Sequence, residues 1–539
     1  MNKKFGVALK FITIALVFFG GLAVLLYLTT SHKDHNVSPL TIGNEQGVGS
    51  PQDAKHYDLE QPSIRKTNSR LSTVKCWFDI PEGKLVHCFH WMLEEIDQVA
   101  YLAVVVIRDQ SSQHFPDPIV YLSGGPGSST YLEPENISSW FLWQELTAAG
   151  RDLVLVDQRG TGYSRPRFDC DGYEKYVREI LGQRLSVSTE FRYLYEAIEQ
   201  CIATLNEKGL KTAMLSTEQS ANDMQGILLA LQYEQWNLVG GSYGTRLALE
   251  WLRHNPRNIR SAILDSVYPH RKGSIAEWPE SIANSFKRLW TICEINLWCD
   301  EKPKELQQRL NTTLNYLERS PQRVSLSLWQ GGWPVQAVID NQRFVSVVYQ
   351  SLYDSTLHET IVSALHEIPQ GNTAALRRLA ENALNSELAP EFTPLVYFAI
   401  ECKETPQTTE EEYRAVVEEY PQWRWITEDG LDYDICPLFG NEKTGELSLL
   451  QYEEIYRAID TPILLLSGGL DPVTPSQWAD ELGQLLPNAA HWHYPSIGHG
   501  VINSSGCVHQ SIKIFLSEPL RIVNSEYDSS GEQLPAPCL

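Results

Sequence analysis

The segment Asn237-Leu-Val-Gly-Gly-Ser-Tyr-Gly244 decides the fold. An apolar run ends at Gly240, and a helical pattern begins at Tyr243. A serine between a strand and a helix needs a sharp turn, and flanking glycines leave room for one. Such a turn exposes the hydroxyl of Ser242 and places the positive end of the next helix near charge that develops there. The segment predicts a serine nucleophile, and a glycine-rich structural turn is the competing interpretation.

Two later segments supply possible partners for Ser242. Asp471 follows an apolar run, and His499 lies between two glycines near the end of the chain. A serine hydroxyl needs a base to take its proton, and histidine suits this task near neutral pH. His491 and His493 are alternative bases. The chain order serine, aspartate, histidine is the order found in α/β-hydrolases, so we predict that fold and that triad.

The rest of the chain supports an α/β fold. Short apolar runs alternate with helical stretches, and they lie at 101–107, 118–122, 152–156, 237–240, 261–265 and 462–466. Near-continuous apolar strands indicate a mostly parallel sheet with helices on both faces. Residues 270–460 separate the serine half from the acid and base half. We predict that they form a helical cap over the carboxyl ends of the strands, inserted between hydrolase parts at 71–269 and 461–539.

The sequence of the N-terminus predicts an export segment. Lys3, Lys4 and Lys10 precede an apolar run over 11–28, which would extend about 27 Å as a helix and nearly span a bilayer. Residues 1–30 are predicted to be an uncleaved membrane anchor, with a cleaved signal peptide as the alternative. The polar stretch 31–70 is a predicted linker. Either alternative leaves the body outside the cytoplasm.

Cysteines and charge fit that location. The chain has 10 cysteines and no Cys-x-x-Cys pair, which favours disulfides over a zinc site. Sequence leaves the connectivity open; pairing of neighbours gives 76–88, 170–201, 293–299, 402–436 and 507–538. The formal net charge of −23 argues against a nucleic-acid partner. The triad chemistry calls for no metal and no cofactor, and none is expected.

A further set of motifs resembles the prolyl iminopeptidase and tripeptidyl aminopeptidase family of α/β-hydrolases. The motifs are Gly124-Gly-Pro-Gly127, Asp157-Gln-Arg-Gly-Thr-Gly162, Gly240-Gly-Ser-Tyr-Gly244, Gly469-Leu-Asp-Pro-Val-Thr-Pro475 and Gly498-His-Gly500. The resemblance implies a serine exopeptidase that acts on peptide N-termini, with Ser242, Asp471 and His499 as nucleophile, acid and base. An oxyanion hole needs two backbone N–H donors, and Tyr243 and Gly125 are the candidates.

The chain resembles the tripeptidyl aminopeptidase branch of this family more than the prolyl iminopeptidase branch. Ser123 stands where prolyl iminopeptidases usually have histidine before the glycine loop, and the segment 399–404 resembles a cysteine motif of the tripeptidyl branch. The tryptophan often found soon after the later cysteine is absent after Cys436. An exopeptidase must recognise the substrate's ammonium group, and Glu401 and Glu404 are candidates, with solvated helix residues as the alternative.

Three functions follow in order of preference. The first is an extracytoplasmic serine peptidase that releases residues or short peptides from free N-termini of peptides through an acyl-enzyme. The second is a carboxylesterase or lipase with the same triad. The third is a noncatalytic binding module on a hydrolase scaffold, which would be expected to have lost a triad residue, although Ser242, Asp471 and His499 are all present.

Overall fold

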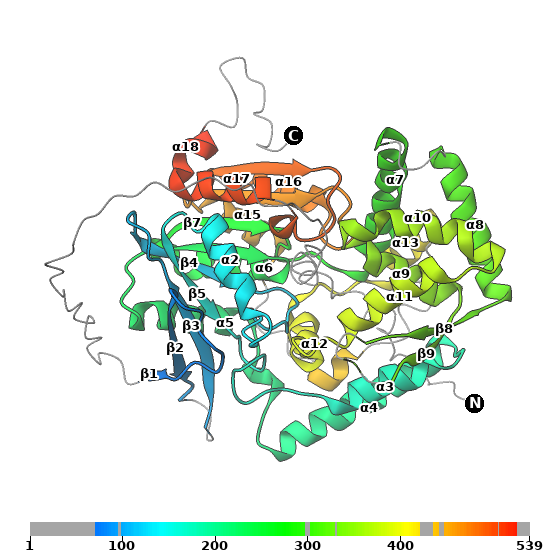
Figure 1. Cartoon of the computed structure of the whole chain (residues 1–539), viewed down its shortest axis with the longest axis horizontal. Coiled ribbons are helices and arrows are strands. Elements are labelled where there is room, and N and C mark those ends of the chain that lie inside the picture. The colour runs from blue at the N-terminus through cyan, green and yellow to red at the C-terminus, as the bar shows by residue number, and fades with distance from the viewer. Residues whose placement is uncertain are drawn as a thin grey trace, which may run out of the picture.

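The computed structural model in Figure 1 describes residues 70–94, 99–296, 302–328, 331, 333–420, 435–440, 447–504 and 506–524. The predicted anchor at 1–30 and nearly all of the predicted linker lie outside the described residues. Among the helices that are described, none is both long enough and apolar enough to cross a membrane.

A nine-stranded sheet forms the centre of the molecule, in the order β1-β2-β3-β5-β4-β6-β7-β10-β11. Its strands are β1 (Leu71–Val74), β2 (Leu85–Met92), β3 (Tyr101–Arg108), β4 (Phe115–Leu122), β5 (Arg151–Val156), β6 (Trp236–Gly241), β7 (Ile259–Asp265), β10 (Ile463–Gly468) and β11 (Ala489–Tyr494). Strands β1, β2, β3 and β5 pair antiparallel, and every pairing from β5 to β11 is parallel. The predicted α/β-hydrolase sheet is confirmed.

Hydrophobic cores lie on both faces of this sheet. One core joins it to α5 (Thr217–Ala230), α6 (Tyr243–His254), α15 (Leu449–Arg457) and α16 (Ser476–Gly483). The other joins it to α2 (Ile137–Thr147) and α17 (Gly506–Ser517), after which α18 (Pro519–Asn524) follows. Strands such as β5 and β10 are buried at every residue, which explains their unbroken apolar sequences.

A third core holds the cap. Within 270–460 it contains α7 (Trp278–Asn296), α8 (Pro303–Arg319), β8 (Gln322–Leu326), β9 (Val335–Ile339), α9 (Asn341–Leu352), α10 (His358–Glu367), α11 (Ala374–Glu387), α12 (Pro394–Glu404) and α13 (Glu410–Glu419). Short 3-10 turns at Ser355–Leu357 and Ile368–Gln370 flank helix α10.

Two helices from outside the predicted insert share the cap core. These are α3 (Asp171–Leu181) and α4 (Val187–Glu207). Figure 1 shows them running along β8 and β9 on the same side of the molecule as α8 and α11. The buried apolar side chains of both helices belong to the cap core. The unit that packs as a cap is therefore larger than the segment 270–460.

Where the structure describes both cysteines of a predicted pair, the two form a disulfide. Cys76 pairs with Cys88, Cys170 with Cys201, and Cys402 with Cys436. Cys293 and Cys507 are also disulfide-bonded. The partners predicted for them, Cys299 and Cys538, lie outside the described residues.

Candidate active site

Ser242 occupies the tight turn that its glycines predict. It follows β6 and begins α6, with φ of +55°, which is a strained conformation for a residue with a side chain. A Cβ atom on Gly240 would lie 2.4 Å from the carbonyl oxygen of Gly244, and one on Gly244 would lie 2.0 Å from that of Leu122. Only glycine fits at these positions. The turn keeps Ser242 half-buried at the carboxyl end of β6.

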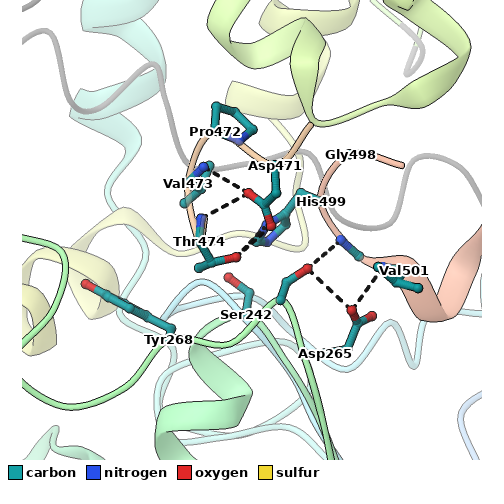
Figure 2. Close-up of polar contacts among 12 residues, drawn as sticks. Ser242, Asp265, Tyr268, Asp471, Pro472, Val473, Thr474, Gly498, His499 and Val501 are labelled. Atoms are coloured by element: carbon teal, nitrogen blue, oxygen red, sulfur yellow. Dashed lines mark hydrogen bonds and ion pairs between the residues drawn. The ribbon is translucent and has the colours of Figure 1, made fainter. Parts of the chain in front are cut away.

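Asp471 and His499 come together from the loops after β10 and β11. Nδ1 of His499 lies 2.8 Å from Oδ2 of Asp471. The other carboxylate oxygen accepts the backbone N–H groups of Val473 and Thr474, each at 2.9 Å. The hydroxyl of Thr474 also donates to Oδ2 of Asp471 at 2.6 Å. Figure 2 shows this bonded pair with Ser242 just below it.

Charge and burial together set the protonation states of His499 and Asp471. Burial lowers the pKa of His499, but the neighbouring carboxylate of Asp471 raises it, and the balance lies above the ordinary histidine value. Burial raises the pKa of Asp471, and the charge and hydrogen bond of His499 outweigh this effect, so the carboxyl stays below its ordinary range. Asp471 therefore holds a proton on Nδ1 of the imidazole and leaves Nε2 as the basic nitrogen.

The serine hydroxyl is close to this pair but not bonded to it. Within the described residues, no hydrogen bond joins Oγ of Ser242 to His499. In enzymes without substrate this bond is often long, and it tightens in the complex. The structure thus brings the three predicted residues to one place, and their catalytic roles stay predictions.

Asp265 and Ser266 hold the histidine loop from the side of the sheet. Asp265, the last residue of β7, accepts the backbone N–H of Val501 at 3.0 Å (Figure 2). It also accepts the backbone N–H of Ile502 at 2.8 Å. The hydroxyl of Ser266 accepts the N–H of Gly500 at 2.8 Å. Burial raises the pKa of Asp265 to about 6. Sequence reasoning missed this role, although an acidic residue at a strand end was a usable signal.

The glycine loop after β4 lies against the nucleophile. A Cβ atom on Gly124 would lie 3.2 Å from Cβ of Ser242. Gly125 has φ of +104°, and a Cβ there would lie 2.8 Å from the backbone nitrogen of Gly127. The backbone nitrogen of Tyr243 starts α6 directly after the serine. This placement suits the predicted oxyanion hole at Gly125 and Tyr243, which stays a prediction.

The Asp-Gln-Arg-Gly motif after β5 forms hydrogen bonds with the loops next to the candidate site. Asp157 accepts the backbone N–H groups of Thr130 at 2.7 Å and Tyr163 at 2.6 Å. Gln158 donates to the hydroxyl of Ser123 at 3.1 Å, at the entrance to the glycine loop.

Arg159, in the same motif, connects the loop after β5 to helix α5. Its guanidinium forms two hydrogen bonds with the carboxylate of Asp223 in α5, at 2.6 Å and 2.9 Å. Both side chains are buried, so this ion pair locks the loop after β5 onto α5.

The two alternative bases lie within the sheet. His491 bonds the hydroxyl of Ser467 at 2.7 Å and Asp480 at 2.8 Å. His493 lies 3.1 Å from the same hydroxyl, and burial together with the charge of Arg288 lowers its pKa to about 4. Neither ring bonds Asp471 within the described residues. His499 is the histidine that the structure pairs with the acid.

Glu401 and Glu404 lie in α12, with different surroundings. Both oxygens of Glu404 accept from Thr217, one from its N–H at 2.8 Å and one from its hydroxyl. Oε2 of Glu401 accepts the hydroxyl of Tyr268 at 2.9 Å and that of Thr405. Oε1 of Glu401 is buried and has no hydrogen-bond partner among the described residues. Glu401 therefore keeps a free acceptor, and Glu404 secures the start of α5.

One cluster has metal-ligand side chains close together in the described part of the chain. Ligand atoms of Glu218, Glu250 and His254 lie within 4.8 Å of one another. Glu250 is already bonded to Arg253 at 2.6 Å and to His270 at 3.1 Å. These bonds overcome burial and bring the pKa of Glu250 well below its ordinary value. An ion-pair network accounts for the clustering.

The chain matches two protein families. A family described as "alpha/beta hydrolase fold" matches residues 117–349, and one described as "TAP-like protein" matches residues 448–522. Together with the sheet order and the serine turn, these matches show that the chain has the α/β-hydrolase fold. Asp471 and His499 both lie in the segment that matches the TAP-like family.

The resemblance to the tripeptidyl aminopeptidase and prolyl iminopeptidase family is confirmed by individual relatives. The chain is 28% identical over 154 residues to the tripeptidyl aminopeptidase of Streptomyces coelicolor, which covers 28% of each protein. It is 22% identical over 205 residues to a putative proline iminopeptidase of Mycoplasma genitalium, covering 37% of this chain and 47% of that protein. The match thus spans less than half of either relative.

Solved structures of α/β-hydrolases align with most of the chain at low TM-scores. The proline iminopeptidase of Mycobacterium smegmatis aligns with a TM-score of 0.33 and 13% identity, covering 81% of this chain and 95% of that one. The α/β-hydrolase MGS-M2 from a deep-sea metagenome library aligns with a TM-score of 0.36 and 14% identity, covering 78% of this chain and 96% of that one.

Proposed function

We propose that the protein is a serine peptidase that releases residues or short peptides from the free N-terminus of peptides through an acyl-enzyme. The observation that carries the proposal is the buried 2.8 Å contact between His499 and Asp471, beside the strained turn of Ser242. The names of the relatives favour a peptidase over other α/β-hydrolase activities.

The proposed reaction begins with attack of Oγ of Ser242 on the carbonyl carbon of the scissile peptide bond. The hydroxyl proton passes to Nε2 of His499, while Asp471 stabilises the imidazolium through Nδ1. The negative carbonyl oxygen of the tetrahedral intermediate accepts the backbone N–H groups of Tyr243 and Gly125. The carbon–nitrogen bond then breaks, and His499 returns its proton to the leaving amine.

Water completes the cycle. His499 takes a proton from the water while the oxygen attacks the acyl carbon, and the ester bond to Ser242 breaks. The proton returns to Oγ, and the N-terminal fragment leaves as a free acid. Each proton passes through the same imidazole, and the chain's own residues supply every acid and base in these steps.

The free oxygen of Glu401 supports recognition of a substrate ammonium group. This carboxylate lies in the cap and binds Tyr268, which follows β7 at the end of the sheet. An ammonium has three donors and pairs well with a carboxylate oxygen that lacks a partner. In this proposal Glu401 binds the amino end of the peptide, and Glu404 supports α5 rather than the substrate.

The proposal includes a location outside the cytoplasm. Disulfides such as Cys170–Cys201 persist in oxidising compartments. The apolar N-terminal segment would export the body and leave it anchored or free after cleavage. The substrates would then be peptides outside the cytoplasm.

The test combines covalent labelling with a substrate panel. A fluorophosphonate should label Ser242 in the parent, and the Ser242→Ala variant should lose both labelling and turnover while keeping its thermal unfolding temperature. The parent should hydrolyse aminoacyl and tripeptidyl amides with a free amino end faster than their N-acetyl forms. Hydrolysis of acyl esters alone would indicate a carboxylesterase. Neither labelling nor turnover would indicate a binding module.

A further inference from the structure

The cap bonds directly to the loop that carries His499. The backbone N–H of His499 donates to the carbonyl oxygen of Tyr353 at 3.1 Å, and the N–H of Gly498 donates to the hydroxyl of Ser355 at 3.0 Å. Tyr353 and Ser355 lie just after α9 in the cap. A Cβ atom on Gly498 would lie 2.5 Å from the carbonyl oxygen of Leu352, so the two segments touch backbone to backbone.

The cap also contacts the loop of the acid. From α7, the hydroxyl of Ser281 donates to the carbonyl oxygen of Pro472 at 2.6 Å, and that of Ser285 donates to the carbonyl oxygen of Asp471 at 3.2 Å. Both serines are buried. Two cap helices thus reach the two loops whose side chains form the Asp471–His499 pair.

We propose that Ser355 of the cap is a positioning residue for His499, acting through the N–H of Gly498. The inference rests on the proposed function. The histidine loop is held on the sheet side by Asp265 and Ser266, and on the cap side by the carbonyl of Tyr353 and the hydroxyl of Ser355. The cap bonds lie directly at and before the histidine, so they fix where the imidazole points.

The contact can be changed without opening a core. Ser355 is exposed, and its hydroxyl is the side-chain part of the cap contact. Loss of this hydroxyl leaves the N–H of Gly498 without its partner and gives the loop freedom to rotate the imidazole away from Asp471. The titratable groups that face His499 are Asp471, Asp265 and Tyr353.

The test compares Ser355→Thr with Ser355→Val, which have the same shape and differ in the hydroxyl. The threonine variant should keep the parent's kcat, and the valine variant should lose about 3- to 10-fold in kcat, with KM within about twofold. Labelling of Ser242 should slow by the same factor. The acid limb of kcat/KM against pH should move to lower pH in the valine variant, because a looser contact with Asp471 raises the pKa of His499 less.

Ser363→Ala is the matched control. Ser363 is an exposed serine of α10, and among the described residues its hydroxyl bonds only to the carbonyl of Glu359 in the same helix, at 3.0 Å. This variant should keep the parent's kcat and pH profile. If the valine variant does not fold, Ser355→Ala removes the hydroxyl alone and takes its place.

Two results would overturn the role of Ser355. One is a hydroxyl-free variant with the parent's kcat and pH profile, and the other is a change confined to KM. Both presuppose a parent that is labelled at Ser242 and hydrolyses its substrate. A parent that is not labelled contradicts the proposed function itself, so the two failures are distinguishable.

Discussion

Tyr268 donates its hydroxyl to Oε2 of Glu401 at 2.9 Å, and its ring lies 3.7 Å from the guanidinium carbon of Arg246. Arg246 is fully buried in α6, one turn after Ser242. Tyr268 thus contacts both a buried cation and a half-buried carboxylate, whose Oε1 has no hydrogen-bond partner in the described residues. A carboxylate oxygen that is removed from water is costly unless it is paired. This arrangement favours a cation as the ligand of Glu401.

The first prediction concerns Glu401→Gln. The substitution keeps the size of the side chain and removes its charge, so kcat/KM for a peptide amide with a free amino end should fall about 10- to 100-fold. The rate for the N-acetyl peptide or a simple ester should change little. Steady-state kinetics on the matched pair measure the ratio, and an unchanged ratio would rule out Glu401 as the amine site.

Glu404→Gln provides the comparison within the same helix. Burial raises the pKa of Glu404, and both of its oxygens accept from Thr217 at the start of α5. Its substitution should therefore lower the thermal unfolding temperature more than it changes the selectivity for a free amine. A selectivity loss in Glu404→Gln alone would assign the ammonium to this residue instead.

The second prediction concerns the pH dependence of the triad. His499 must be neutral to accept the serine proton, and its pKa is raised, so kcat/KM should fall as the pH drops through a value above 6.5. Asp471→Asn removes the charge that raises this pKa. The acid limb should then move to lower pH, and kcat should fall by about 10³- to 10⁴-fold.

The rate of fluorophosphonate labelling against pH measures this shift even when turnover is too slow to follow. Thr474→Val serves as a milder control, because it removes one hydrogen bond to the carboxylate and keeps its charge. An acid limb that stays in place in Asp471→Asn would show that another group sets the pH dependence.

The local sequence is sufficient to predict the strands of the sheet and the turn at Ser242. The run at 152–156 is buried at every position of β5, so its unbroken apolar pattern reports directly on its environment. The glycines around Ser242 are equally direct signals, because close backbone contacts exclude any Cβ there. Helix α6 begins at Tyr243, as the sequence predicts, and it ends at His254, two residues before Pro256.

Contacts between distant segments are what sequence could not supply. Nothing local to Ser355 or Ser281 indicates that their hydroxyls reach the loops after β11 and β10. The apolar face of α3 equally gives no sign that it packs with the cap rather than the sheet. A single amino-acid sequence does not indicate which distant segments contact each other.

The third prediction concerns the disulfide between Cys170 and Cys201. It closes a loop of 31 residues between α3 and α4, and loops of this length gain about 2–4 kcal/mol from the cross-link. Replacing both cysteines by alanine should lower the free energy of unfolding by that amount in urea titrations. The same substitutions at Cys76 and Cys88, which close a shorter loop of 12 residues, should cost less. Equal costs would contradict the loop-length argument.

The last prediction concerns Glu387, a buried carboxyl of α11 that accepts the hydroxyl of Tyr173. Burial raises its pKa to about 8. The folded state therefore holds the proton more tightly than the unfolded chain, whose glutamates titrate near 4.5. This protonation contributes stability below about pH 4.5, and the contribution is lost as the pH rises towards 8.

Glu387→Gln stays neutral at every pH and can still accept from Tyr173. Its thermal unfolding temperature, measured relative to the parent, should therefore rise steadily between pH 5 and pH 8. Glu359→Gln, at an exposed position of α10, should show a difference from the parent that does not change with pH. A difference that is also constant for Glu387→Gln would mean that the carboxyl ionises freely inside the cap, which its burial among apolar side chains argues against.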